Sequence, residues 1–325
     1  MSHRPNRTPG SISPLPAILA AALAAVFIWA GGAHAASSSS NAQATYGSPD
    51  EAVKALVDAA KSGDVDAIVH IFGPGSQDWI LSGDPVQDAQ VRQRFVTAYE
   101  QKSSIEMQGA DKAVLSVGDD GFPFPFPLVH KADRWSFDTA AGKEELLNRW
   151  VGEDELNTIQ TLLAIVDAQH DYVAMVIGQG HLPEYAQKFR SSPGKKDGLY
   201  WATAPGEKES PLGPLLAEAV KVGYRAPAAD SGPVSYEGYY YRILTGQGAH
   251  APDGAYDYVV KGKMIGGFAV IAYPAKYGVS GVKTFMVNQN GVVYEADLGP
   301  QTAKVAEKIQ KFDPGSGWSM EEQAK

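Results

Sequence analysis

Twice along the chain, helical spacing of apolar residues gives way to short strand-like runs, and this order constrains the fold most strongly. Helices that precede a set of strands, instead of alternating with them, are typical of α+β folds with antiparallel sheets. We therefore predict an α+β fold with two domains, each with helices packed on a small, mostly antiparallel sheet. The first domain should span residues 48–150 and the second residues 151–325.

The first block begins with three helix signals. "SPDE" at 48–51 is a capping box with proline at the first helical position, and apolar residues follow at 53, 56, 57 and 60, on one helical face. Asp64 and Asp84-Pro85 predict the starts of two further helices. Strands are then predicted over 113–117, 122–130 and 135–138.

The middle strand contains "FPFPFP" at 122–127. Proline has no N–H, and alternate N–H groups of a strand point the same way, so the prolines at 123, 125 and 127 predict a sheet edge. The three phenylalanines should share one face. In one interpretation that face packs on the core, and the prolines prevent edge-to-edge aggregation of the strand. In the other it forms an aromatic platform for a ligand. Core packing is the preferred interpretation.

The second block has a long helix, an irregular crossing and a meander. A short helix over 142–150 should close the first domain, with a hinge at 151–154. A longer helix should begin at Asp154, with apolar residues at 156, 159, 163, 166 and 173 on one face. The crossing, 191–235, is rich in Pro, Gly, Ser and Lys, and a short helix over 215–222 interrupts it.

Four strand-like runs form the meander over 236–298, and a last helix is predicted over 300–312. Lys261-Gly262 predicts one turn. Asn290-Gly291 is a stronger hairpin signal, with positive φ expected at both residues. In the preceding run Phe285 and Val287 alternate with Met286 and Asn288, as in a half-buried strand, so the hairpin is interpreted as scaffold.

The first 35 residues have the pattern of a signal peptide. Arg4 and Arg7 precede an apolar run at 15–30, and "AHA" at 33–35 supplies the small residues of a cleavage site. A retained membrane anchor is the alternative, but the run is shorter than the ~20 residues that a span requires. We predict cleavage after Ala35, a periplasmic mature protein and a disordered leader over 36–47.

The composition excludes several classes of function. The chain has no cysteine, which rules out disulfides, thiolate chemistry and cysteine-ligated metal centres. A net charge of −9 without basic runs disfavours nucleic acid and anionic membranes as partners. No later segment is apolar enough for stable membrane insertion, and no cofactor motif, metal motif or catalytic residue set is identified.

Two clusters remain as low-specificity binding candidates. Asp167, His170 and Asp171 share a helical face, which suits a base or metal site but is more often a solvated face. Two S-x-x-K strings occur at 192–195 and 280–283. In serine acyl-transferases of the penicillin-recognising type this motif lies at a helix start, which brings the lysine beside the nucleophilic serine. Neither string lies at a predicted helix start, so both are interpreted as accidental.

The second cluster consists of strand tyrosines: Tyr239, Tyr240, Tyr241, Tyr256 and Tyr258. Tyrosine combines an apolar ring with a polar tip and suits a sugar or peptide face. It is also an ordinary strand residue, so core or edge packing is the preferred interpretation.

Several stretches carry a resemblance to a known family: "EAVKALVDAAKSGD", "RWSFDTAAGKEELLNRWVG", "GYYYRILTGQG" and "FAVIAYPAKYGVSGVKTFMVNQNGVVYEADLG". They resemble a bacterial envelope family called domain of unknown function 2950. The layout of the N-terminal half is similar to the nuclear transport factor two-like cone. That of the C-terminal half is similar to the soluble domain of type IV pilins and pseudopilins.

The resemblance implies an exported protein in two parts without an assigned activity. We expect a non-catalytic component that binds or organises an envelope protein or polymer. The alternative is an enzyme or small-ligand binder that uses a groove between the domains, lined by tyrosines and acids of 236–299.

Overall fold

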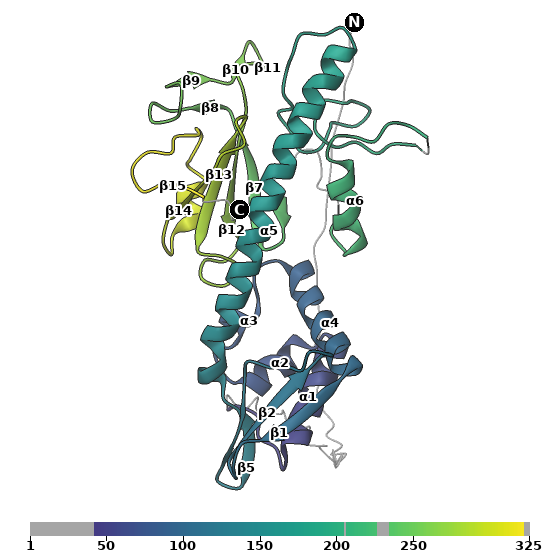
Figure 1. Ribbon diagram of the computed structural model, residues 1–325, viewed down its shortest axis with the longest axis vertical. Helices are drawn as coiled ribbons and strands as arrows, with labels where there is room; N and C mark the ends of the chain where they lie inside the picture. The colour runs from purple at the N-terminus through teal and green to yellow at the C-terminus, as the bar shows by residue number, and fades with distance from the viewer. Residues whose placement is uncertain (1–41, 205, 226–233, 322–325) are drawn as a thin grey trace, which may run out of the picture. The chain divides into compact units, whose positions relative to one another are not determined.

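The computed structural model describes residues 42–204, 206–225 and 234–321 (Figure 1). The proposed signal peptide lies outside the described residues. Residues 42–47, which we expected to be disordered, are ordered, because Tyr46 forms an antiparallel bridge with Trp135. Helices pack on antiparallel sheets in both halves of the described chain, so the α+β class is confirmed.

Four helices come first: α1 (Pro49–Ser62), α2 (Val65–Phe72), α3 (Gln77–Ile80) and α4 (Pro85–Gln101). Three of them begin where the sequence predicted, because each has a local side-chain cap. Ser48, Asp64 and Asp84 accept hydrogen bonds from the first-turn N–H groups of α1, α2 and α4. The one-turn helix α3 has no such cap and was not predicted.

The first sheet has the strand order β1–β2–β4–β5, with β3 paired to β2. Its strands are β1 (Ser103–Met107), β2 (Lys112–Val117), β3 (Phe122–Pro123), β4 (Leu128–Lys131) and β5 (Arg134–Phe137). The single strand predicted over 122–130 is therefore wrong, since residues 124–127 interrupt it. Phe122 is 55% exposed whereas Phe126 is buried, so the phenylalanines do not share one face.

One continuous helix, α5 (Thr139–Gly178), replaces the two helices predicted over 142–150 and from Asp154. The expected hinge at 151–154 thus lies inside a helix. The second half of α5 packs on the larger sheet (Figure 1) through Ile159, Leu162, Ile165 and Val166. Leu156, which we placed on the apolar face, is 64% exposed.

The larger sheet is antiparallel throughout, with the order β15–β14–β13–β12–β7–β6. Its strands are β6 (Val234–Tyr236), β7 (Tyr239–Leu244), β12 (Ala269–Pro274), β13 (Lys283–Asn288), β14 (Val293–Asp297) and β15 (Ser319–Met320). Helix α5 contacts β12 and β13, and α7 (Thr302–Ala306) also contacts β12. The last predicted helix is therefore shorter than expected.

The central strands of this sheet are buried on both faces. Every residue of β12 is buried, and so are Phe285, Met286 and Asn288 of β13. The expectation that β13 is half-buried is wrong: α5 contacts this strand, and on the neighbouring β14 Phe312, from the segment after α7, packs on Tyr294. The scaffold interpretation of the hairpin fits this double burial.

Short strands and a helix complete the described chain: α6 (Gly213–Lys221), β8 (Gly246–Gln247), β9 (Tyr256–Asp257), β10 (Val259–Val260) and β11 (Lys263–Met264). The predicted turn between β10 and β11 is confirmed, with φ of 50° at Lys261 and 80° at Gly262. At the second predicted turn only Gly291 has positive φ, 73°; Asn290 does not. There the N–H of Asn290 donates to the side-chain oxygen of Asn288.

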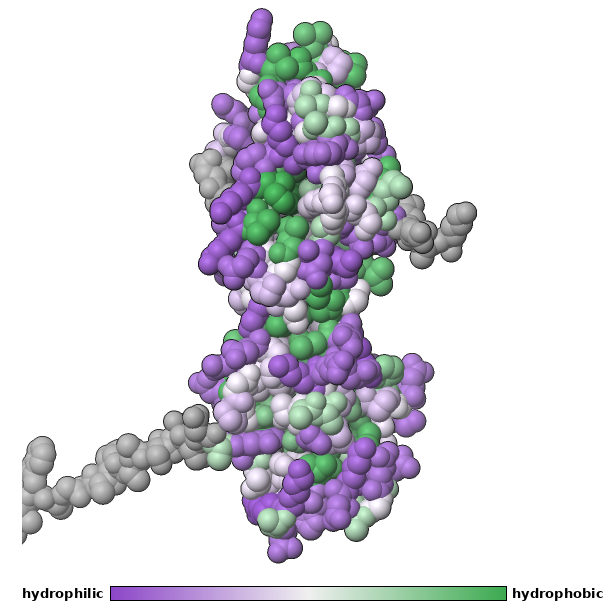
Figure 2. Space-filling view, turned by 90° about the vertical axis from the view of Figure 1, so that its left-hand side faces the viewer, coloured by the Kyte–Doolittle hydropathy of each residue, from purple (hydrophilic) through white to green (hydrophobic). Residues whose placement is uncertain are grey.

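Among the described residues no helix combines the length and apolar character that crossing a membrane requires. The face shown in Figure 2 is mainly hydrophilic, with small groups of apolar side chains between the polar ones. Large exposed apolar residues are spread along the chain, from Met107 to Met320.

Two glycines allow a matched test of the turn. Both Gly291 and Gly152 have open space where a Cβ would lie, but Gly291 has a φ of 73° and Gly152 lies within α5. We expect Gly291→Ala to lower the free energy of unfolding by about 1–2 kcal/mol, because a left-handed backbone strains alanine. Gly152→Ala should raise it by roughly 0.5–1 kcal/mol. Urea unfolding measures both, and equal effects would contradict the turn assignment.

Candidate functional site

A cavity of about 120 Å³ lies within the N-terminal half of the described chain, and aromatic rings form a large part of its apolar lining. The Phe126 ring lines it, 4.6 Å from the ring centroid of Phe72 and stacked on Trp79 at 5.4 Å. Phe95 of α4 contacts Phe124 at 5.2 Å. We call this space the aromatic cavity.

The broken strand explains why the cavity is lined in this way. Because β3 ends at Pro123 and β4 begins at Leu128, the intervening residues leave the ladder and turn the Phe124 and Phe126 rings toward the helices. Gly142 of α5 lets the helix approach this segment. A Cβ at Gly142 would collide with the Phe126 ring and with the carbonyl of Pro125.

Polar side chains gather on one side of the aromatic cavity, from α4 and the middle of α5. They are Gln87, Asp88, Arg92, Arg94, Glu153 and Asp154. Arg94 and Glu153 are paired at 2.6 Å, and an Asp88 carboxylate oxygen accepts the N–H of Ser82 at 3.0 Å. Arg94 and Glu153 thus neutralise each other, Asp88 is held by the backbone of Ser82, and the rest of the cavity wall is largely apolar.

Asp154 is the most perturbed group in this polar set. It is 3% exposed, and Gln87 donates a side-chain N–H to its Oδ1. Burial, together with the charges of Glu153 and Glu237, raises the pKa of Asp154 to about 8. The carboxyl is therefore largely protonated at neutral pH. Burial also raises the pKa of Asp88, a second acid beside the cavity.

The protonated state of Asp154 also provides a partner for Gln87. The side-chain oxygen of Gln87 is buried and has no other hydrogen-bond partner in the described chain. The Gln87 oxygen and Oδ2 of Asp154 both lie next to Gly238. A Cβ built on Gly238 would be 2.9 Å from the Gln87 oxygen and 2.8 Å from Oδ2. A neutral acid paired with a primary amide satisfies donors and acceptors on both sides. Gly238, with a φ of 74°, has no space for a side chain.

A second buried acid, Asp84, holds the surrounding elements together. Its carboxylate caps α4 and also accepts hydrogen bonds from the Tyr224 hydroxyl at 3.0 Å and the Ser235 hydroxyl at 2.9 Å. Burial, together with the Asp84 charge, raises the pKa of Tyr224, which keeps its donating proton. The position of α4, and hence of one cavity wall, is fixed by these bonds.

The predicted tyrosine cluster does not form one open surface. Tyr239, Tyr241 and Tyr258 are buried in the larger core, and Tyr240 and Tyr256 are partly buried against it. The Tyr258 hydroxyl donates to Gln247 at 2.9 Å. Only Tyr241 of the five borders a described cavity, a space of about 60 Å³ beside α6.

The predicted acid–histidine cluster is exposed. Asp167, His170 and Asp171 lie on the solvent side of α5, and the His170 ring is 6.2 Å from that of Phe268. No group of three or more His, Asp or Glu residues in the described chain is arranged to hold a metal ion. Of the three, Asp171 alone borders a described cavity, a space of about 340 Å³ beside the last turns of α5.

Comparison with protein families gives a match over nearly all the described chain. A family model described as "Protein of unknown function (DUF2950)" matches residues 43–320. The chain belongs to the DUF2950 family. No curated protein and no solved structure matches it.

In this DUF2950 protein the match contains both the aromatic cavity and the larger sheet, so the family resemblance inferred from the sequence is confirmed. Sequence reasoning missed the cavity because its walls come from separate segments between Leu56 and Asp154. The one available signal was "FPFPFP", whose aromatic alternative we weighed and did not prefer.

The raised pKa of Asp154 predicts how the stability of the fold depends on pH. The folded chain keeps a proton up to about pH 8, whereas the unfolded chain, in which an aspartate has its ordinary pKa of 3.8, loses that proton near pH 4. This group therefore makes stability fall as pH rises from about 4 to 8, with no further loss above pH 8. We expect Asp154→Asn to reduce that slope and to raise stability at pH 8 by roughly 1–3 kcal/mol, since one pKa unit is worth about 1.4 kcal/mol.

Thermal and urea unfolding at pH 5, 6.5 and 8 measure this effect. Asp167→Asn removes an exposed carboxylate from the same helix and serves as the matched control. If both variants change the pH slope equally, the buried, protonated assignment of Asp154 is wrong.

Proposed function

We propose that this protein is an exported, non-catalytic binding component of the cell envelope, and that its aromatic cavity holds an apolar, ring-sized group of its ligand or partner. One observation carries the proposal: an aromatic-lined space beside two acids whose pKa burial raises. Concave apolar sites with a few convergent polar groups are the usual form of small-molecule sites.

The size of the cavity defines the ligand class. An empty apolar cavity of about 150 Å³ stays dry and accepts benzene, and the aromatic cavity, at about 120 Å³, is of that order. Because the neutral Asp154 acid and the Gln87 amide hydrogen-bond each other, the apolar wall sets the ligand class and favours an uncharged ring over a cation. A phenol, an indole or a comparable ring at the end of a larger molecule has these properties.

Support for export comes from the sequence. The apolar run at 15–30 and the small residues before Ala36 have the order of a signal peptide. A protein exported by such a signal peptide reaches the compartment that contains envelope polymers and envelope proteins. We therefore propose that its partner is a component of the envelope.

The raised pKa of Asp154 favours a second candidate, an enzyme in which this carboxyl carries a proton to a substrate. The binding proposal is preferred because Asp154 is almost fully buried and already paired with Gln87. Incubation of wild type and Asp154→Asn with envelope extract, followed by mass spectrometry, separates the two. A product formed by the wild type alone would favour the enzyme.

Filling the cavity tests the binding proposal directly. Ala60 of α1 lines it and is 8% exposed. We expect phenol and indole to raise the melting temperature of the full chain, because a ligand that binds only the folded state stabilises it. Ala60→Met should abolish that increase while the protein still folds, since methionine adapts to irregular gaps.

Ala89→Met, on the exposed face of α4, is the matched control and should respond to the ligands as the wild type does. Equal stabilisation of Ala60→Met and wild type, or no stabilisation of the wild type by either ring compound, would contradict the proposal.

Export has its own test. N-terminal sequencing of the protein recovered from a periplasmic fraction should begin with "ASSSS" at Ala36. Recovery only in the membrane fraction with Met1 intact would show that the apolar run is a retained anchor.

A further inference from the structure

The first strand of the first sheet, β1, has an open edge. Among the described residues β1 pairs with β2 alone, in a continuous antiparallel register from Ser103 to Met107. Its residues are exposed except for Ile105, which is partly buried against the core of the N-terminal half. Met107 is 50% exposed. No residue of β1 lines the aromatic cavity, so this edge is separate from the proposed function.

Two hydrogen bonds at the ends of β1 show which of its backbone groups point away from β2. The N–H of Gln108 donates to the carbonyl of Lys112 at 2.8 Å, and the N–H of Gly118 donates to the carbonyl of Lys102 at 2.9 Å. Backbone groups of successive strand residues point to opposite sides, so the even-numbered residues bond to β2. The N–H and C=O groups that face the open edge are those of Ser103, Ile105 and Met107.

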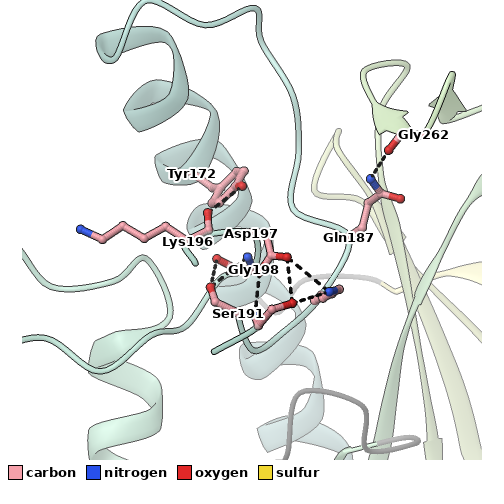
Figure 3. Close-up of polar contacts among 9 residues, drawn as sticks. Tyr172, Gln187, Ser191, Lys196, Asp197, Gly198 and Gly262 are labelled. Carbon is pink, nitrogen blue, oxygen red and sulfur yellow. Dashed lines mark hydrogen bonds and ion pairs between the residues drawn. The ribbon is translucent and has the colours of Figure 1, made fainter. Parts of the chain in front are cut away.

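Backbone groups in less regular parts of the chain are completed by side chains. In the crossing segment that follows α5, the Tyr172 hydroxyl donates to the carbonyl of Lys196 at 3.0 Å (Figure 3). The Ser191 hydroxyl accepts from the N–H of Gly198 at 3.0 Å and donates to its carbonyl at 3.3 Å (Figure 3). Within the described residues no such bond reaches the outward groups of β1.

The other edges of the two main sheets are protected. At the far end of the first sheet, Tyr46 forms an antiparallel bridge with Trp135 of β5, and the short strand β3 ends in Pro123. The larger sheet ends in β15 and β6, which have only two and three residues. Short strands, proline and covering segments are common means of preventing edge pairing. The five-residue β1 has no proline and no bulge, so its edge is free to pair with another strand.

The strand is complementary to a second copy of itself. When two β1 strands pair antiparallel with Ile105 at the centre, Ser103 of one copy lies opposite Met107 of the other. This register pairs all of the outward N–H and C=O groups. It also places the two partly buried Ile105 side chains next to each other across the two-fold axis.

Charge favours a second copy as the partner. Lys102 and Glu106 are exposed, and neither side chain forms an ion pair within the described residues. Lys102 continues the extended backbone, with φ of −161° and ψ of 135°. In the symmetric pairing Glu106 is opposite Ser104 of the second copy and diagonal to its Lys102, within reach of long side chains. Opposite charges therefore meet on both sides of the axis, and like charges do not.

We propose that two copies of this chain associate through β1 as an antiparallel, two-fold symmetric pair, which joins their first sheets into one continuous sheet. Two-fold contacts between identical surfaces are the commonest kind in homo-oligomers. The contact is only one strand wide, so the expected Kd is on the order of 10–100 μM.

Analytical ultracentrifugation of the full chain over a concentration series tests the proposal. The wild type should convert from monomer to dimer across the series. Lys102→Glu and Glu106→Lys each place like charges diagonally across the axis, and each should weaken the dimer about tenfold. The double variant Lys102→Glu/Glu106→Lys exchanges the two charges and should restore the wild-type affinity.

A wild type that stays monomeric throughout would leave the edge to an extended segment of another protein and overturns the proposal. Single variants that dimerise as the wild type does, or a double variant weaker than both, also overturn it. Both residues are exposed, so the monomers should keep the wild-type melting temperature and its increase with phenol or indole. The dimer and the aromatic cavity are thus tested separately.

The register has its own test, because the chain has no cysteine. Ser104 and Glu106 of the two copies lie directly opposite, where Cβ atoms are about 4.5–5.5 Å apart. A mixture of Ser104→Cys and Glu106→Cys should form a disulfide-linked dimer under mild oxidation. Lys308→Cys, at an exposed position after α7, replaces Ser104→Cys in the control mixture. Equal cross-linking in the two mixtures overturns the strand pairing.

Discussion

The carboxylate of Asp84 connects parts of the chain that are far apart in sequence. The carboxylate caps α4 locally. It also forms tertiary hydrogen bonds, because Tyr224 and Ser235 donate to the same side chain. Removal of the carboxylate would leave the Tyr224 and Ser235 hydroxyls without this acceptor, and leaving a buried donor unpaired costs more than the bond itself contributes. Since α4 provides one wall of the aromatic cavity, the shape of that cavity depends on a carboxylate that does not line it.

Asp154 shows the opposite solution to burying an acid. Asp84 is surrounded by hydrogen-bond donors, whereas Asp154 has one amide donor and nearby acids, so desolvation raises its pKa. The two acids lie on either side of Gly238, which approaches them closely because it has no side chain. One accepts hydrogen bonds from several elements and the other is biased to carry a proton, so Asp154 contributes an uncharged acid to the polar side of the aromatic cavity.

The sequence predicted what local geometry determines. The capped starts of α1, α2 and α4 and the turn at Lys261-Gly262 depend on residues within a few positions of one another, and all were correct. Features set by distant partners were not predicted. Phe312 from the C-terminal segment packs on Tyr294 of β14, the neighbour of β13 in the sheet, and α5 continues through 151–154 without a local stop. The aromatic cavity was missed for the same reason, since it combines residues from segments that no periodicity connects.

Unpaired polar atoms do not single out a binding site in the described chain. Four buried side-chain atoms in the described chain have no direct hydrogen-bond partner: the Gln87 oxygen, which the protonated Asp154 completes, and atoms of Trp201, Ser210 and Thr284. The last of these, in Thr284, lies within β13 of the packed sheet. A core could replace such groups with apolar ones of similar shape at little cost. The proposed function therefore draws on the aromatic cavity beside α4 and α5 and not on the tyrosine-rich sheet, whose tyrosines are packed in or against the core.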